Sequence, residues 1–191
     1  MSIIINSQEV MKGVRFLIII MVGMLLVTSC SEEQDFDQLD DLTITPNYET
    51  SIFYVKAQET LINRVEGLDF FTQDFNFDAF EEPFFADRVL AGVLTYELEN
   101  TTSKPIEIRL EFLDEAENVL DTEVFSMDAA PTAILQRDVA YGATGKSLDI
   151  IKATSEIRLT AINLGDNSSE SALQDPAIVL RSSAQFTLEL Q

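Results

Sequence analysis

The chain has 191 residues, with 12 Lys and Arg against 33 Asp and Glu, no His, no Trp and one Cys, and its formal net charge is −21. The lack of His excludes Ser-His-Asp and Cys-His catalytic arrangements, and together with the single Cys it excludes the common zinc and haem sites. A chain this acidic, with no cluster of Lys and Arg, repels phosphate backbones and is not expected to bind nucleic acid. It also lacks a basic patch for anionic headgroups, so membrane attachment requires covalent lipid or a spanning segment.

Residues 1–29 have the layout of a secretory signal peptide. Lys12 and Arg15 precede an apolar run over residues 16–27. This run is shorter than the roughly 20 residues that a membrane-spanning helix needs, so a signal peptide is the better interpretation. Met11 stands directly before an ordinary positively charged n-region, and we therefore predict that translation begins there.

The apolar run ends in Val27, Thr28, Ser29 and Cys30. This sequence resembles the lipobox of bacterial lipoproteins, in which small residues precede a Cys that is acylated and becomes the new N-terminus. The resemblance implies a mature protein that begins at Cys30 with lipid such as palmitate attached, and two or three acyl chains hold a protein on a membrane more firmly than one. The alternative is a lone Cys that is buried as a small hydrophobic residue.

Residues 30–49 are expected to form a lipidated acidic tether, because a segment with many acids and no base cannot collapse. The opening residues are similar to the acidic export signal of surface-exposed lipoproteins of the Bacteroidetes type. That resemblance implies a lipid-anchored protein of the outer membrane, facing either the cell surface or the periplasm. The alternative is a plain solvated spacer. The residues that would form the export signal are Ser31, Glu32, Glu33 and Asp35.

Residues 50–191 are expected to form one domain, since a chain of this length buries enough surface to fold without disulfides. Apolar and polar residues alternate with a period of two in several segments, which is typical of strands with one buried face. These segments are 94–98, 106–112, 119–127, 157–161 and 184–190.

The first two of these segments are separated by polar residues 100–105, which we expect to form a hairpin connection. Helical signal is confined to residues 147–152, where Ser147 suits the N-cap position. The pattern predicts an all-β fold, a single antiparallel β-sandwich with one short helix. Residues 94–120 also resemble the strand-hairpin-strand centre of immunoglobulin-like sandwiches, which implies a fold of that kind.

Asp74, Asn76 and Asp78 have the spacing that opens an EF-hand loop, in which alternate oxygens converge on Ca²⁺. Ala79 replaces the Gly of the sharp turn, and Phe85 stands where the loop requires a bidentate Glu. The same spacing arises whenever one strand face is polar, so a plain half-buried strand is preferred. Asp74, Asn76 and Asp78 stay candidate ligands of a weak, irregular Ca²⁺ site, and no other cofactor is predicted.

Residues 142–147 invite comparison with the phosphate-binding loop, whose pattern ends in Gly-Lys-Ser/Thr. The pattern requires its first glycine at position 140, where this chain has Ala140. No parallel strand-helix-strand pattern surrounds the segment. A glycine-bearing turn that enters the short helix is therefore expected.

Phenylalanine is concentrated in one stretch of the chain. Seven of the 13 Phe are Phe70, Phe71, Phe75, Phe77, Phe80, Phe84 and Phe85. Alternation predicts that Phe75 and Phe77 share a buried face, whereas two adjacent rings of an extended chain point oppositely. The pairs Phe70-Phe71 and Phe84-Phe85 are therefore each expected to expose at least one ring, as a candidate partner surface, unless all these rings fill the core.

These observations predict a lipid-anchored outer-membrane lipoprotein that acts as a non-catalytic binding or assembly module for an unidentified component of the cell envelope. The alternative is a surface module that binds Ca²⁺ or glycans. A third function is glycoside hydrolysis, in which two carboxylates about 5 to 9 Å apart face a groove. With 33 acids, some pair meets any such distance test, so this pattern does not point to an enzyme.

Overall fold

The computed structural model of the protein describes residues 43–190 except 66–68, 78 and 132, together with residues 11–13, 15–18 and 20–21. The chain divides into two compact units, residues 1–41 and 42–191. In the first unit the described residues are helical. None of the helices within the described residues has both the length and the apolar character needed to cross a bilayer.

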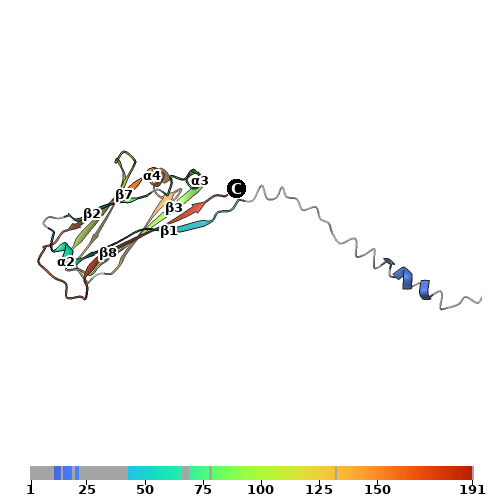
Figure 1. The fold of residues 1–191 in the computed structure, drawn as a ribbon, viewed down its shortest axis with the longest axis horizontal. Helices are drawn as coiled ribbons and strands as arrows, with labels where there is room; N and C mark the ends of the chain where they lie inside the picture. Colours follow the sequence, from blue (N-terminus) through green and yellow to red (C-terminus); the bar gives the residue numbers. More distant parts are fainter. Residues whose placement is uncertain are drawn as a thin grey trace, which may run out of the picture. The chain divides into compact units, whose positions relative to one another are not determined.

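The second unit is a sandwich of two four-stranded antiparallel sheets (Figure 1). The first sheet contains, in spatial order, β1 (Asn47–Gln58), β8 (Ala177–Leu188), β3 (Val89–Asn100) and β6 (Leu135–Gly142). The second contains β2 (Asp69–Asn76), β7 (Glu156–Asn163), β4 (Ile106–Leu113) and β5 (Val119–Met127). The predicted all-β antiparallel sandwich is confirmed.

The connectivity of the sandwich is that of a jelly roll. The chain changes sheet at every connection except the β4–β5 hairpin, and its first and last strands pair side by side. Eight strands in two such sheets form the double Greek key of a jelly roll. An immunoglobulin-like domain instead divides seven strands into sheets of four and three. The immunoglobulin-like analogy therefore extends to the sandwich and not to its connectivity.

The prediction of a hairpin between β3 and β4 is wrong, because residues 101–105 cross from one sheet to the other. Asn100 organises this crossing from a buried position at the end of β3. Its amide donates to the backbone oxygens of Lys104 (2.7 Å) and Asp128 (2.8 Å). Its oxygen accepts from the backbone N–H (3.0 Å) and the hydroxyl (2.7 Å) of Thr102. One buried side chain thus supplies hydrogen-bond partners to the backbone groups of this tight turn, and the turn needs no partner strand.

A buried carboxylate closes the same end of the sandwich, where α2 (Glu59–Ile62) lies beside the β7–β8 loop (Figure 1). Glu59 is only 2% exposed. It accepts hydrogen bonds from the backbone N–H and the hydroxyl of Ser103, both at 2.6 Å, and from the backbone N–H of Ser171 at 2.8 Å. Burial by itself raises the pKa of Glu59, but these hydrogen bonds and the charge of Lys104 outweigh it and hold the pKa below its ordinary value.

Lys104 is fully buried next to this carboxylate. Its ammonium donates to the backbone oxygen and the hydroxyl of Ser169, both at 2.6 Å, and lies 3.4 Å from Asp166. Backbone N–H groups of Ser169 and Ser168 hold the pKa of Asp166 well below its usual range. The buried charges of Glu59 and Lys104 therefore fix the β7–β8 loop against the β3–β4 crossing.

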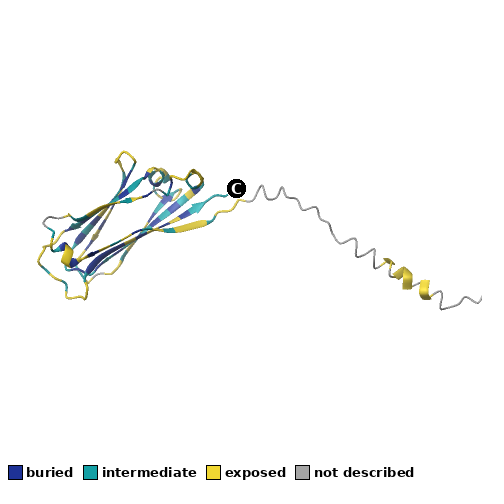
Figure 2. Ribbon diagram, viewed as in Figure 1, coloured by how far each residue is buried: buried dark blue, intermediate teal, exposed yellow. Residues whose placement is uncertain are grey.

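The core fills the space between the inner faces of the two sheets (Figure 2). Phe80, Phe85 and Phe186 form a mutually packed aromatic group at one end, with ring centroids 5.3 to 5.4 Å apart. The predicted helix is present as α4 (Leu148–Ala153), and the Ser147 hydroxyl accepts from the N–H of Asp149 as its N-cap.

Two further helices, α2 and α3 (Pro83–Ala86), accompany α4, whereas the sequence predicted a single helix. Each has one turn, which is too short to show a helical period. At the N-terminal side of the domain, β1 already begins at Asn47. Residues 47–49, which we placed in the tether, therefore pair with β8.

Candidate functional site

The predicted lipidation and export residues lie outside the described residues. They are Cys30, Ser31, Glu32, Glu33 and Asp35. Their roles stay predictions from the sequence. The described chain enters the sandwich at the end that carries α3 and the C-terminus, where Ile44 pairs with Leu190 (Figure 1).

Of the candidate Ca²⁺ ligands, Asp74 lies on β2 and is bound by an arginine. The Arg158 guanidinium donates to both of its carboxylate oxygens, at 2.8 and 3.0 Å, and this lowers the pKa of Asp74. Asn76 ends β2, and Asp78 lies outside the described residues. No group of three His, Cys, Asp or Glu side chains is placed to hold a metal ion in the part of the chain that the structure describes. A cation at Asp74 would first have to displace the guanidinium.

Phe70 and Phe71 depart from the expected alternation. Both rings are half-buried, pack against the core and line a narrow hollow between the sheets together with Ile108 and Leu180. The register of β2 shifts between Asp69 and Phe71. A β-bulge at this point lets two consecutive side chains turn to the same face of the sheet. The prediction that one ring of this pair is exposed is therefore wrong.

The second pair, Phe84-Phe85, divides as predicted. Phe85 packs with Phe80 and Phe186, whereas Phe84 is 61% exposed and the Arg88 guanidinium lies over it, 4.0 Å from its ring centre. Of the two rings expected to share a buried face, Phe77 is buried in the core. Phe75 is half-buried and stacks on Phe53 with ring centres 4.9 Å apart.

Several exposed apolar residues lie, with Phe84, on segments that meet at the end where the chain enters the sandwich. We call this surface the Phe84 patch. It consists of Ile44 (51% exposed), Tyr48 (53%), Phe84 (61%) and Leu90 (46%).

Backbone contacts hold the parts of the Phe84 patch together. Ile44 and Leu190 exchange two hydrogen bonds of 2.9 and 2.8 Å, and Glu189 donates to the backbone oxygen of Arg88 at 2.8 Å. The Tyr48 ring lies 6.1 Å from that of Phe85. Sequence reasoning found only Phe84, because these contacts join residues from opposite ends of the domain and leave no local signal.

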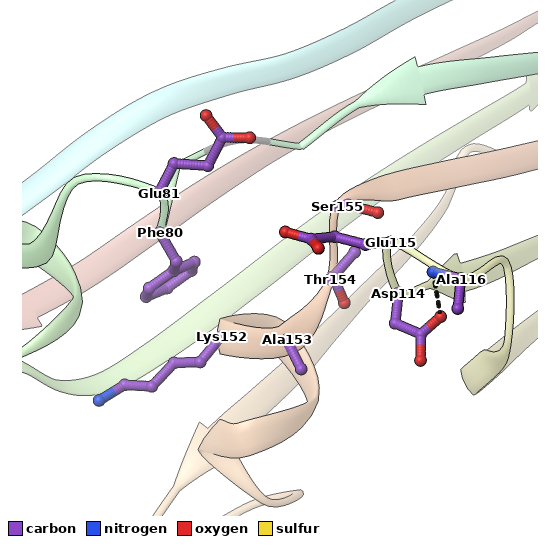
Figure 3. A pocket seen from close by; sticks show the side chains of 9 residues that line it. All are labelled: Phe80, Glu81, Asp114, Glu115, Ala116, Lys152, Ala153, Thr154 and Ser155. Carbon is purple, nitrogen blue, oxygen red and sulfur yellow. Dashed lines mark hydrogen bonds between the residues drawn. The ribbon is translucent and has the colours of Figure 1, made fainter.

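A hollow of about 500 Å³ lies next to α4 (Figure 3). Its charged side chains do not converge, since Glu81 and Lys152 extend away from one another in Figure 3. Its hydroxyls donate to backbone oxygens, Thr154 to Ile150 at 2.7 Å and Ser155 to Leu113 at 3.2 Å. Hydroxyls bound in this way support the fold rather than act as nucleophiles. The lining residues are Phe80, Glu81, Asp114, Glu115, Ala116, Lys152, Ala153, Thr154 and Ser155.

The turn that was compared with a phosphate-binding loop leads into α4 as expected. Gly142 has a φ of +111°, in the region that favours glycine, and the lysine of the turn is engaged elsewhere. The Lys146 ammonium lies 2.6 Å from carboxylate oxygens of both Asp121 and Glu123 on β5. Burial by itself lowers the pKa of Lys146, but these two acceptors outweigh it and raise the pKa. Lys146 thus closes the side of the sandwich between β5 and β6.

Comparisons with known proteins find no match in sequence and a low level of likeness among solved structures. No family model matches the chain, and no curated protein is significantly similar to it in sequence. Among solved structures, the VP2 subviral particle of infectious bursal disease virus matches with 9% identity and a TM-score of 0.38, over 75% of this chain and 32% of the VP2 chain. Turnip yellow mosaic virus matches with 10% identity and a TM-score of 0.34, over 78% of this chain and 82% of the viral chain. The chain thus spans about a third of the VP2 chain, and likeness at this level carries no information on function.

Proposed function

We propose that the protein is a lipid-anchored outer-membrane lipoprotein whose β-sandwich is a non-catalytic binding or assembly module for another component of the cell envelope. The observation that carries this proposal is the apolar run that ends in Val27-Thr28-Ser29-Cys30, followed by an acidic segment. In a bacterial lipoprotein, lipid on such a Cys is the membrane anchor. An acidic tether then separates this anchor from the folded domain.

The Phe84 patch is the surface that we assign to the partner. Contiguous exposed apolar side chains with charged neighbours are typical of protein interaction sites. Phe84 is the most exposed member of this patch, and aromatic side chains bury large areas when a partner covers them. Because the Arg88 guanidinium already lies against the Phe84 ring, this side chain loses little further conformational entropy when a partner binds.

Replacing Cys30 by Ala is expected to release the protein from the membrane or to mislocalise it, because the acyl chains of this residue are the proposed anchor. Metabolic labelling with a palmitate analogue and membrane fractionation measure the effect. Wild-type protein should carry the label and sediment with membranes, whereas Cys30→Ala should do neither. Unlabelled wild-type protein, or a Cys30→Ala variant that still sediments with membranes, contradicts the lipid anchor.

Replacing Glu32, Glu33 and Asp35 together by Ala is expected to change the side of the outer membrane on which the domain is displayed. The resemblance to an acidic export signal is the reason for this expectation. Protease shaving of intact cells reads the outcome, with a variant that replaces Asp37, Asp40 and Asp41 by Ala as the matched control for charge. Equal protection of the wild type and the Glu32/Glu33/Asp35 variant shows that these acids are only a spacer.

A further inference from the structure

The outer face of the β1-β8-β3-β6 sheet carries a row of small hydroxyl side chains that runs across the strands. The antiparallel register aligns Ser51 on β1 with Ser183 on β8, and Ser183 in turn with Thr95 on β3. The row continues to Asp138 on β6. Because alternate residues of a strand share one face, the four side chains lie side by side on the surface.

Longer side chains flank this row on both sides. On one side, Arg181 of β8 pairs in register with Tyr54 of β1 and Glu97 of β3. The register of β1 shifts between Ser51 and Phe53, which places Tyr54 on the outer face, where it is 60% exposed. A floor of short side chains beside a wall of long ones produces a groove.

The opposite wall is built by Glu49 and Gln185, which are cross-strand partners and are joined by a hydrogen bond of 2.8 Å. Two adjoining hollows of about 450 and 410 Å³ occupy the groove, and both are lined by Ser51, Thr95 and Ser183. The groove therefore crosses the strands and has room for several units of an extended ligand. It lies on the sheet face, whereas the Phe84 patch lies at the end of the domain.

The hydrogen-bonding groups of this groove are mostly acceptors and hydroxyls. Thr95 donates to Asp138 at 2.8 Å, whereas the Ser51 and Ser183 hydroxyls bind no other described residue. Among the described residues that line the groove the one cation is Arg181, which pairs with Glu99 at 3.7 Å and lies 5.9 Å from the Tyr54 ring centre. A ligand that fits must supply many donors and no negative charge.

We propose that this groove binds a neutral glycan chain. Sugar hydroxyls donate to the carboxylates of Glu49, Glu97 and Asp138 and exchange hydrogen bonds with the serine floor, while the Tyr54 ring offers an apolar face to the carbohydrate C–H groups. Polyanions and lipid phosphates are repelled by the same carboxylates. A protein partner is disfavoured because the groove lacks the buried apolar anchors of protein interfaces, which the Phe84 patch supplies elsewhere. The inference does not depend on the lipid anchor.

Affinity electrophoresis of the full-length protein tests this assignment. Native gels containing xyloglucan, galactomannan or glycogen serve as neutral probes, and polygalacturonate serves as the anionic probe. At least one neutral polysaccharide should retard the wild-type protein, and polygalacturonate should not. Ser183→Tyr fills the floor of the groove with a ring that exposed strands accommodate well, and it should weaken binding at least tenfold. Tyr54→Ala should also weaken binding, because it removes the ring that faces the carbohydrate C–H groups.

Thr160→Tyr is the matched control, because Thr160 lies at the centre of the outer face of the other sheet, opposite Thr72 and Arg109. This variant should be retarded as strongly as the wild type. Equal urea midpoints for the wild type, Ser183→Tyr and Thr160→Tyr show that Ser183→Tyr acts on the groove and not on folding. A wild-type protein that no neutral probe retards overturns the proposal, as do retardation by polygalacturonate and unchanged retardation of Ser183→Tyr.

Discussion

Replacing Glu59 by Ala is expected to destabilise the domain by about 3 to 5 kcal/mol, a large part of the stability of an ordinary domain. The substitution removes three hydrogen bonds and leaves the partly buried backbone N–H groups of Ser103 and Ser171 without this acceptor. It also removes a negative charge that interacts with the buried ammonium of Lys104. Urea unfolding of the full-length protein near pH 7 measures the loss as a lower midpoint.

Glu59→Gln is the matched control, since it keeps one acceptor oxygen and the shape of the side chain but removes the charge. Its midpoint should lie between those of the wild type and Glu59→Ala. Because the folded pKa of Glu59 lies below its ordinary value, its contribution to stability is complete above that value and is lost as the pH falls through the folded pKa. Part of the acid sensitivity of the wild type should therefore be missing in Glu59→Gln. A midpoint of Glu59→Ala within error of the wild type contradicts the structural role of this carboxylate.

The strands β3, β4, β5, β7 and β8 were readable from the sequence, whereas β1 and β6 were not predicted. Ile106, Ile108, Leu110 and Phe112 alternate with charged residues, and they face the core from β4 as the period of two predicts. The capped helix α4 was also found, because its signal lies within a few neighbouring residues. Such local patterns indicate which side chains of a regular strand face the core.

The pairing of strands was not readable, because it is decided by contacts between distant residues. A polar segment before Pro105 predicts a turn, whether the chain then returns to the same sheet or crosses to the other. The crossing depends on Asn100 and on two buried charges, Glu59 and Lys104, which sequence reasoning places on the surface by default. The bulge in β2 likewise leaves no local trace, although it decides where Phe70 and Phe71 point.

The proposed glycan groove shows the same limit. Ser51, Thr95 and Ser183 are ordinary polar residues in sequence, separated by tens of positions, and only the register of β1, β8 and β3 brings them into one row. The exposed face of Tyr54 also depends on the irregular register of β1. A binding surface assembled from several strands can thus be found only when the pairing is known.

Phe77 and Phe84 should respond oppositely to truncation. Phe77 is 5% exposed and packs on Phe80 with ring centres 6.2 Å apart, so Phe77→Ala leaves a cavity in the core. Such a change in a packed core costs about 3 to 5 kcal/mol, and the variant should fold poorly. Phe84→Ala removes an exposed ring and its contact with Arg88, which is worth about 1 kcal/mol or less. Urea midpoints of the two full-length variants measure the difference.

The same two variants separate a core role from a partner role when crosslinking and pull-down from intact envelopes are added. Phe84→Ala should fold like the wild type and yet capture less of the envelope component, because the Phe84 patch loses its most exposed ring. Leu173→Ala is the control, since Leu173 is 49% exposed in the β7–β8 loop at the far end of the sandwich, and its capture should be unchanged. If Phe84→Ala destabilises the domain as much as Phe77→Ala, its ring belongs to the core. If it folds normally and captures as much as Leu173→Ala, the partner binds another surface of the domain.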